Sequence, residues 1–274
     1  MKLKKILICG YLLLAASTPL SAVAVHGPAK RAQAIPSGPS IRVLLEKDVS
    51  SAFLEAKGPY RVMRRDSGSS LSTGGLGKRF VIHAIQDGLR WGEEYPDVYQ
   101  ICIVPLSKET SILVNGIQYK GAISIYHVRD HHITIVNEVP IEEYLKSTLT
   151  VQYENSLSKE AMAALAIAAR TEAYNQALQG SSSPRPWDIA AHEVSYYGYG
   201  VTQRKNGVEE SVDLTRYMVL ESVKNKGPAQ NIRLIPDKAD ALAKQGCDAQ
   251  KILRTYFPQT KIGATIHPDE VAIR

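Results

Sequence analysis

The sequence contains no low-complexity run, no nucleic-acid-binding motif and, after its first segment, no apolar stretch long enough to span a bilayer. Basic residues are spread along the chain, so nothing favours nucleic acid as a partner. Cysteine is scarce, and only Cys102 and Cys247 follow the first segment. What is present, 44% hydrophobic and 22% charged residues over 274 positions, is typical of a folded protein with a substantial core.

Residues 1–24 have the pattern of an export signal. Lys2, Lys4 and Lys5 precede a short apolar run, and Ala22-Val23-Ala24 supplies a small-x-small cleavage site. The apolar run is too short for a spanning helix, although a retained membrane anchor is the alternative. Removal of three lysines and no acids lowers the formal net charge from +6 to +3. We therefore expect a protein secreted across the inner membrane, periplasmic or associated with the cell wall, with no stable membrane span after cleavage.

The two remaining cysteines allow a disulfide in an oxidising compartment. Cys102, however, lies in the apolar run Ile101-Cys102-Ile103-Val104, where a cysteine is more often a small core residue. The sequence therefore favours two free thiols.

Residues 25–40 are rich in Ala, Pro and Ser and predict a disordered leader. From Ile41 onward, short runs rich in Val, Ile and Tyr predict strands. These runs are residues 41–48, 79–87, 98–106, 111–128 and 131–139. Asn115-Gly116, between two such runs, predicts a tight hairpin. Residues 70–79, rich in Ser and Gly, predict a flexible loop.

The pattern changes at Pro140. Residues 141–149 predict a short helix, and residues 158–178 predict the main helix of the chain, with Ser158 as its N-cap. Alanines along this helix leave room for another element to pack closely. Residues 237–257 predict a helix that is interrupted at Gly246. Strands followed by helices, without alternation, predict an α+β fold, with one domain over residues 41–262 and a tail over 263–274.

Several segments of this region, in this order, resemble the SpoIID family (stage II sporulation protein D). The segments are Val114-Asn115-Gly116, Tyr119-Lys120-Gly121, Val136-Asn137 with Pro140, Glu142 or Glu143 and Tyr144-Leu145, then residues 160–171, 214–220 and 241–262. No single piece is diagnostic, but their order is specific. The resemblance covers roughly 150 residues.

The resemblance implies a function in the cell wall. Enzymes of the family are lytic transglycosylases, which cleave between MurNAc and GlcNAc in glycan strands stripped of stem peptides and leave a 1,6-anhydro end. This chemistry needs a carboxylic acid that protonates the glycosidic oxygen and then acts as a base on the sugar's own 6-hydroxyl. The implied partners are peptidoglycan glycan strands and, as an open point, a peptidoglycan amidase that first strips them. The implied context is cell-wall remodelling or division.

The catalytic glutamate of the family lies in a P-S-E-M-P motif, eight positions before the glutamate that opens the alanine-rich helix. Counting back eight positions from Glu160 gives Gln152, within the run TVQYE. A neutral amide cannot act as a general acid. Glu154, two positions on, is the candidate replacement, with Tyr153 and Leu157 available to bury it. The alternative is a solvated loop glutamate, whose charged form the nearby helix N-terminus favours.

The chain departs from the family at two further places. Some members carry a Cys/His cluster of zinc type after the alanine-rich helix, but residues 187–200 contain no cysteine, and His192 with Glu193 cannot complete a four-ligand site. We therefore predict no metal and no cofactor. Toward the C-terminus, the family's S-Q-x-G-A signature is replaced by residues 235–239, so substrate binding is expected to be altered or reduced.

Candidate substrate-binding residues remain on the alanine-rich helix and in the loop after it. Tyr196 and Tyr197, with Tyr199 and Trp187, form an aromatic segment suited to stacking on sugar rings, and core packing is the alternative for each. His192, expected to be a neutral histidine in a surface loop, is a further candidate binding residue. Arg170 and Thr171 match the family's A-A-R-T. Arg170 would hold a ligand carboxylate, such as that of a lactyl group, or pair with an internal acid such as Asp188.

Three functions fit the sequence. The first is a peptidoglycan-directed lytic transglycosylase. The second is a glycan-binding protein that has lost the acid, and the third is an exported scaffold with a decayed domain. Thiol chemistry is excluded because no cysteine lies near the motif, and no motif supports a serine triad.

Overall fold

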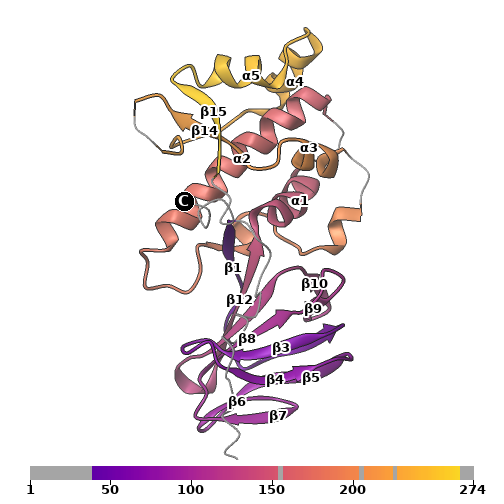
Figure 1. The fold of residues 1–274 in the computed structure, drawn as a ribbon, viewed down its shortest axis with the longest axis vertical. Helices are drawn as coiled ribbons and strands as arrows, with labels where there is room; N and C mark the ends of the chain where they lie inside the picture. Colours follow the sequence, from indigo (N-terminus) through magenta and orange to yellow (C-terminus); the bar gives the residue numbers. More distant parts are fainter. Residues whose placement is uncertain (1–38, 154–156, 204–206, 225–226, 266–274) are drawn as a thin grey trace, which may run out of the picture. The chain divides into compact units, whose positions relative to one another are not determined.

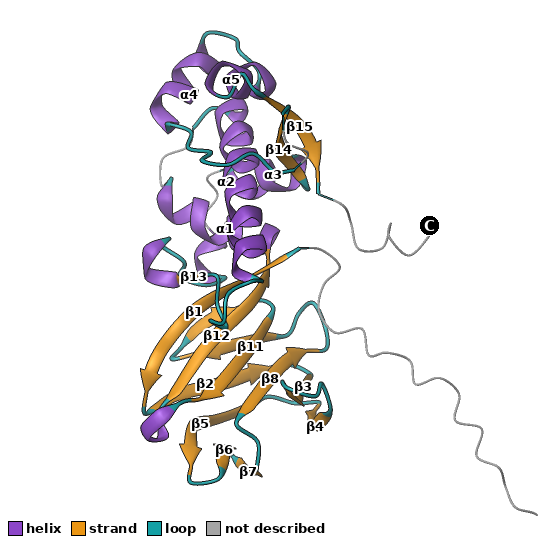
Figure 2. Cartoon of the chain, turned by 90° about the vertical axis from the view of Figure 1, so that its left-hand side faces the viewer, coloured by secondary structure: helices purple, strands orange, loops and turns teal. Residues whose placement is uncertain are grey.

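The computed structural model describes residues 39–153, 157–203, 207–224 and 227–265. The predicted signal segment, most of the predicted leader, Glu154 and most of the predicted tail lie outside the described residues. No helix within the described residues is long and apolar enough to cross a membrane. The described chain has the predicted α+β composition, with strands first and helices mainly after residue 140 (Figures 1 and 2).

The first sheet has seven strands in the order β13-β1-β12-β11-β8-β3-β4. Its strands are β1 (Ser40–Val49), β3 (Tyr60–Arg64), β4 (Ser70–Gly74), β8 (Gln100–Pro105), β11 (Ala122–His127), β12 (Ile133–Pro140) and β13 (Ile189–Ala190). Only the short β13 pairs in parallel, beside β1, and the other neighbours are antiparallel.

The second sheet is antiparallel, with the order β10-β9-β2-β5-β6-β7. Its strands are β2 (Ser51–Lys57), β5 (Lys78–Ile85), β6 (Gly88–Trp91), β7 (Glu93–Pro96), β9 (Ser111–Val114) and β10 (Ile117–Tyr119). The β9–β10 turn confirms the predicted hairpin, because Asn115 and Gly116 both have positive φ, at 50° and 86°. A third sheet pairs β14 (Met218–Ser222) with β15 (Thr260–Ala264).

The prediction of a loop over residues 70–79 is wrong. Residues 70–74 form β4, an edge strand paired with β3, and β5 begins at Lys78. The Tyr60 ring covers Gly74 so closely that a Cβ there would lie 2.4 Å from the ring. The glycine is therefore needed for an aromatic side chain to pack on the edge strand.

The helices begin directly after β12. They are α1 (Ile141–Gln152), α2 (Lys159–Gly180), α3 (Val208–Leu214), α4 (Pro236–Lys244) and α5 (Ala249–Tyr256), with short 3-10 turns η1 (Arg129–His131), η2 (Ala191–Glu193) and η3 (Gly200–Gln203). The predicted break at Gly246 is confirmed as the turn between α4 and α5, where Gly246 has φ of 86°. Ser158 stands at the N-cap of α2, but its hydroxyl donates to Asp240 at 2.6 Å instead of capping the helix.

The alanine-rich α2 contributes to two separate hydrophobic clusters. Met162, Ala166 and Ala173 belong to a first cluster, built mainly from strand residues and α1. Its opposite face, including Leu165 and Ala168, belongs to a second cluster with β14, α4 and α5. Because alanine has a small side chain, elements pack closely on both faces of α2 (Figure 1).

Candidate functional site

Gln152, which the sequence analysis aligns with the family's acid, is the last residue of α1. Its side chain is exposed, and its Nε2 donates to the carbonyl oxygen of Val194 at 3.3 Å. The next residue, Tyr153, is half-buried and packs against both hydrophobic clusters, as does Leu157. Burial raises the pKa of the Tyr153 hydroxyl. The end of α1 is thus tied to the loop over residues 191–199.

Tyr196 anchors this loop to the core. Its side chain is buried, and its hydroxyl donates to Asn137 Oδ1 at 2.7 Å. The amide group of Asn137 donates in turn to the carbonyls of Lys120 and Ala122, which fixes its orientation. Burial, above all, raises the pKa of Tyr196 well above its usual value. The structure therefore makes Tyr196 a core residue, which corrects its prediction as a substrate contact.

The segment after Tyr196 is held on both sides. Ser147 of α1 donates to the Gly198 carbonyl at 2.7 Å, and the Tyr199 amide donates to the Gln118 carbonyl at 2.6 Å. Gly198 has φ of 74°, and a Cβ there would lie 2.4 Å from the Gln118 oxygen. Only glycine fits this close approach, so the loop has a fixed path over β10.

Tyr197, unlike the buried Tyr196, is exposed to solvent. It is 52% exposed, and His192 on the same loop is also exposed. We call Gln152, His192 and Tyr197 the tyrosine rim. Trp187, by contrast, is partly buried and packs against a small hydrophobic cluster. Gln152, a catalytic candidate, and His192 and Tyr197, candidate binding residues, are all exposed.

Arg170 is 1% exposed and forms a bidentate ion pair with Glu142 of α1, with N–O distances of 2.9 and 2.8 Å. Its guanidinium also donates to the carbonyls of Val212 and Met218. Arg170 therefore pairs with an internal acid, which was one of its two predicted roles, but the acid is Glu142 and not Asp188. Its donors face the protein interior, so it does not hold a ligand carboxylate in this structure. Asp188 instead pairs with Arg42, at 2.5 Å.

Thr171 is fully buried. Its Oγ1 donates to the Ile167 carbonyl at 2.7 Å and accepts from the Leu220 amide at 2.9 Å. It therefore attaches β14 to α2, and its prediction as a substrate-binding residue is corrected in the same way.

The structure also places the other segments and cysteines that the sequence analysis singled out. Residues 235–239, where the family signature is missing, begin α4, and Ala239 is buried in the second cluster. Cys102 and Cys247 are free, buried and in different clusters. Within the described residues, no three His, Cys, Asp or Glu side chains converge as metal ligands.

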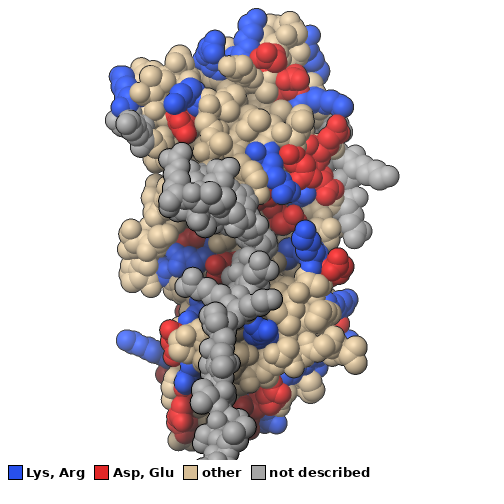
Figure 3. Space-filling model, in the orientation of Figure 1, with Lys and Arg blue, Asp and Glu red and all other residues tan. Residues whose placement is uncertain are grey.

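Charges of both signs are interspersed over the described residues on the face shown in Figure 3. The Arg170–Glu142 pair is buried and does not contribute to the surface. Lys146 is also buried, but its partner Asp213 is 43% exposed.

Comparisons with known proteins agree with the motifs. A family model described as "SpoIID: Stage II sporulation protein" matches residues 129–221. An uncharacterized protein of Chlamydia muridarum is 41% identical over 82% of this chain and 77% of its own length. One from Chlamydia pneumoniae is 39% identical, over 80% and 79%. One from Brachyspira hyodysenteriae is 29% identical, over 65% and 47%. No solved structure matches the chain.

Proposed function

This chain belongs to the SpoIID family of stage II sporulation proteins, and on that premise we propose that it is exported and acts on the glycan strands of peptidoglycan. Its proposed reaction is that of a lytic transglycosylase, the activity associated with the family. The cleaved bond is the one between MurNAc and GlcNAc in strands without stem peptides, during wall remodelling or division.

The observation that carries this proposal is the tyrosine rim. By its spacing from Glu160, Gln152 corresponds to the family's catalytic position. Its Nε2 donates to the carbonyl of Val194, which lies on the same loop as Tyr197. An exposed tyrosine ring offers an apolar face to a sugar and a hydroxyl to the surrounding water. A glycan strand lying on the rim would therefore pass the end of α1.

The proposed general acid is Glu154. It follows Gln152 by two positions and Tyr153 by one. Its carboxyl would protonate the glycosidic oxygen and then take the proton of the sugar's 6-hydroxyl, which attacks the same anomeric carbon. No outside nucleophile is required. Gln152 would contribute hydrogen bonds but no proton, because an amide is too weak an acid.

The test is incubation of the purified mature chain with denuded glycan strands, followed by mass detection of 1,6-anhydro products. We expect product from the wild type, a loss of roughly 100-fold or more in Glu154→Gln, and near-normal product in the control Gln152→Ala. Product from Glu154→Gln at the wild-type rate would rule out this acid.

A second candidate is a non-catalytic glycan-binding protein. The bond from the Gln152 amide to the Val194 carbonyl favours it, because a deprotonated glutamate at position 152 could only accept and would leave that carbonyl without this donor. This candidate holds if the wild type retains glycan in a pull-down but yields no anhydro product. Failure of both measurements would leave only the scaffold hypothesis.

A further inference from the structure

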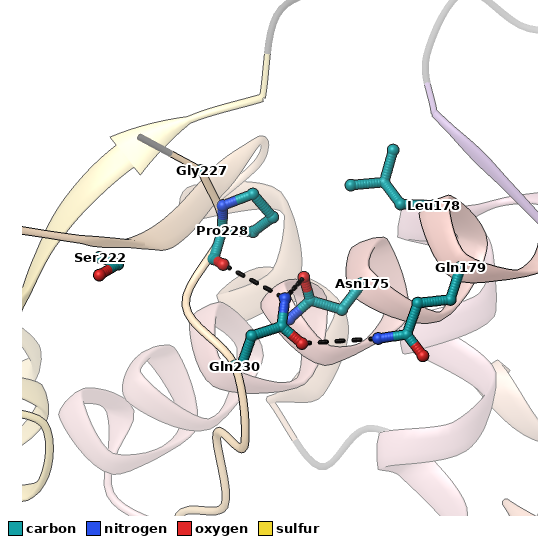
Figure 4. A pocket seen from close by; sticks show the side chains of 7 residues that line it. All are labelled: Asn175, Leu178, Gln179, Ser222, Gly227, Pro228 and Gln230. Atoms are coloured by element: carbon teal, nitrogen blue, oxygen red, sulfur yellow. Dashed lines mark hydrogen bonds between the residues drawn. The ribbon is translucent and has the colours of Figure 1, made fainter. Parts of the chain in front are cut away.

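A cleft lies along the C-terminal half of α2, apart from the tyrosine rim. It has a volume of about 380 Å³, and the loop that follows β14 forms its other wall (Figure 4). Its lining residues are Asn175, Leu178, Gln179, Ser222, Gly227, Pro228 and Gln230. We call it the amide cleft, because three of these residues carry carboxamide groups.

The three carboxamides form one directed chain of hydrogen bonds. Asn175, which is 3% exposed, donates through Nδ2 to the Ala229 carbonyl at 2.7 Å. Its Oδ1 accepts from Gln230 Nε2 at 2.9 Å, and Gln230 Oε1 accepts from Gln179 Nε2 at 3.5 Å. The buried carbonyl of Ala229 thus sets the direction of each amide in turn. The chain ends at Gln179, whose Oε1 faces away from Gln230 (Figure 4).

The wall opposite α2 is held in place by the backbone. The Ala229 amide donates to the Leu220 carbonyl at 2.7 Å, and the Ser222 amide donates to the Gly227 carbonyl at 3.0 Å. Thr171, one helical turn before Asn175, holds Leu220 from the helix side. Thr171, Asn175 and Gln179 follow one another at four-residue spacing, so they lie on one stripe of α2. The cleft is therefore preformed.

The lining contains no charged residue, and this indicates a neutral ligand. Carboxamides offer both donors and acceptors, which matches hydroxyl groups and an acetamido group. Leu178 is 49% exposed and, with Pro228, gives the cleft an apolar side for a sugar face or an acetyl methyl. A lactyl carboxylate would find no cation among the lining residues, which disfavours MurNAc.

We propose that the amide cleft binds a GlcNAc unit of the glycan strand, as a second contact separate from the tyrosine rim. This inference rests on the proposed function. The residues that line the cleft include none of the residues of the tyrosine rim. A polymer that reaches both places gains avidity, because its second contact forms intramolecularly.

The experiment titrates GlcNAc tetramer into the mature chain and measures the dissociation constant by calorimetry. We expect Gln179→Ala to weaken binding roughly five-fold, the loss of about one neutral hydrogen bond. Leu178→Asp should weaken it at least as much. The matched control is Gln176→Ala, on the same helix but outside the cleft, which should bind as the wild type does. Alanine favours helix at both positions, so folding is preserved.

The outcomes separate the two proposals. If the tetramer binds and Gln179→Ala, Leu178→Asp and Gln176→Ala all match the wild type, the cleft proposal is overturned, and the proposed function stands when Tyr197→Ala weakens binding. If the wild type binds neither the tetramer nor denuded strands, both proposals fail. An unsubstituted glucose tetramer should bind the wild type more weakly, and equal binding would overturn the acetamido assignment.

Discussion

The buried framework around Arg170 and the exposed tyrosine rim differ in their relation to solvent, although residues from both match the same family. In the framework, the Arg170 guanidinium pairs with Glu142, and the Thr171 hydroxyl accepts from the Leu220 amide. Both side chains also donate to neighbouring carbonyls. In the rim, Tyr197 is half exposed, and the Gln152 side chain makes one long bond. A match to a family motif therefore does not say whether a residue binds a ligand, and its exposure has to be known as well.

The largest expected effect is in the framework. Arg170→Met leaves the Glu142 carboxylate buried without its partner, and we expect a loss of about 3–5 kcal/mol in the free energy of unfolding. Urea denaturation measures it. The double variant Arg170→Met/Glu142→Leu should recover most of the loss. As a matched control, the exposed pair Lys159–Glu210 should cost less than about 1 kcal/mol when Lys159 becomes Ala. Equal losses of stability at both pairs would contradict the claim that the buried Arg170–Glu142 pair is the more important of the two.

A smaller effect is expected where the framework meets the loop of the rim. Tyr196→Phe removes the donor to Asn137 Oδ1, which is buried, so we expect a loss of about 1–3 kcal/mol. Tyr197→Phe, one position on, changes an exposed hydroxyl and should stay within about 0.5 kcal/mol of the wild type. Thermal and urea unfolding of the two variants, side by side, test this. A larger loss in Tyr197→Phe would reverse the proposed roles.

A pH-dependent effect is expected at Asp240, which joins α4 to the start of α2. Hydrogen bonds from Lys244 and from the Ser158 side chain and amide lower the pKa of Asp240 from 3.8 to about 2. Its contribution to stability is therefore present above about pH 4 and is lost as the pH falls toward 2. Asp240→Asn should be less stable by about 1 kcal/mol at pH 7. Unfolding measured across this range should show the difference shrinking below pH 4, and a constant difference would contradict the assignment.

Local signals in the sequence predicted much of the fold. The Asn115-Gly116 hairpin, the main helix and the break at Gly246 were all correct, because turn residues and helical spacing act over a few positions. The loop predicted over residues 70–79 is wrong, because Gly74 in this run makes room for a long-range contact with the Tyr60 ring. Composition within a short window carries no information on such a contact.

The site was predicted less well than the fold, for the same reason. Arg170 has its partner twenty-eight positions away on another helix, and no local pattern distinguished Glu142 from Glu143. Tyr196 and Tyr197 are adjacent, yet the Tyr196 hydroxyl donates to Asn137 and the Tyr197 side chain is exposed. Two amides of the cleft come from α2 and the third, Gln230, from the loop after β14, and no local pattern in the sequence brings them together.

The most direct test of the difference between framework and rim is the affinity of folded Tyr197→Ala and Tyr196→Phe for denuded glycan strands, measured in one titration series. We expect Tyr197→Ala to bind roughly five- to ten-fold more weakly than the wild type, with unchanged stability. Tyr196→Phe should bind like the wild type at a temperature where it is folded. If Tyr197→Ala keeps full affinity while Tyr196→Phe loses it, the tyrosine rim is not the glycan-binding surface.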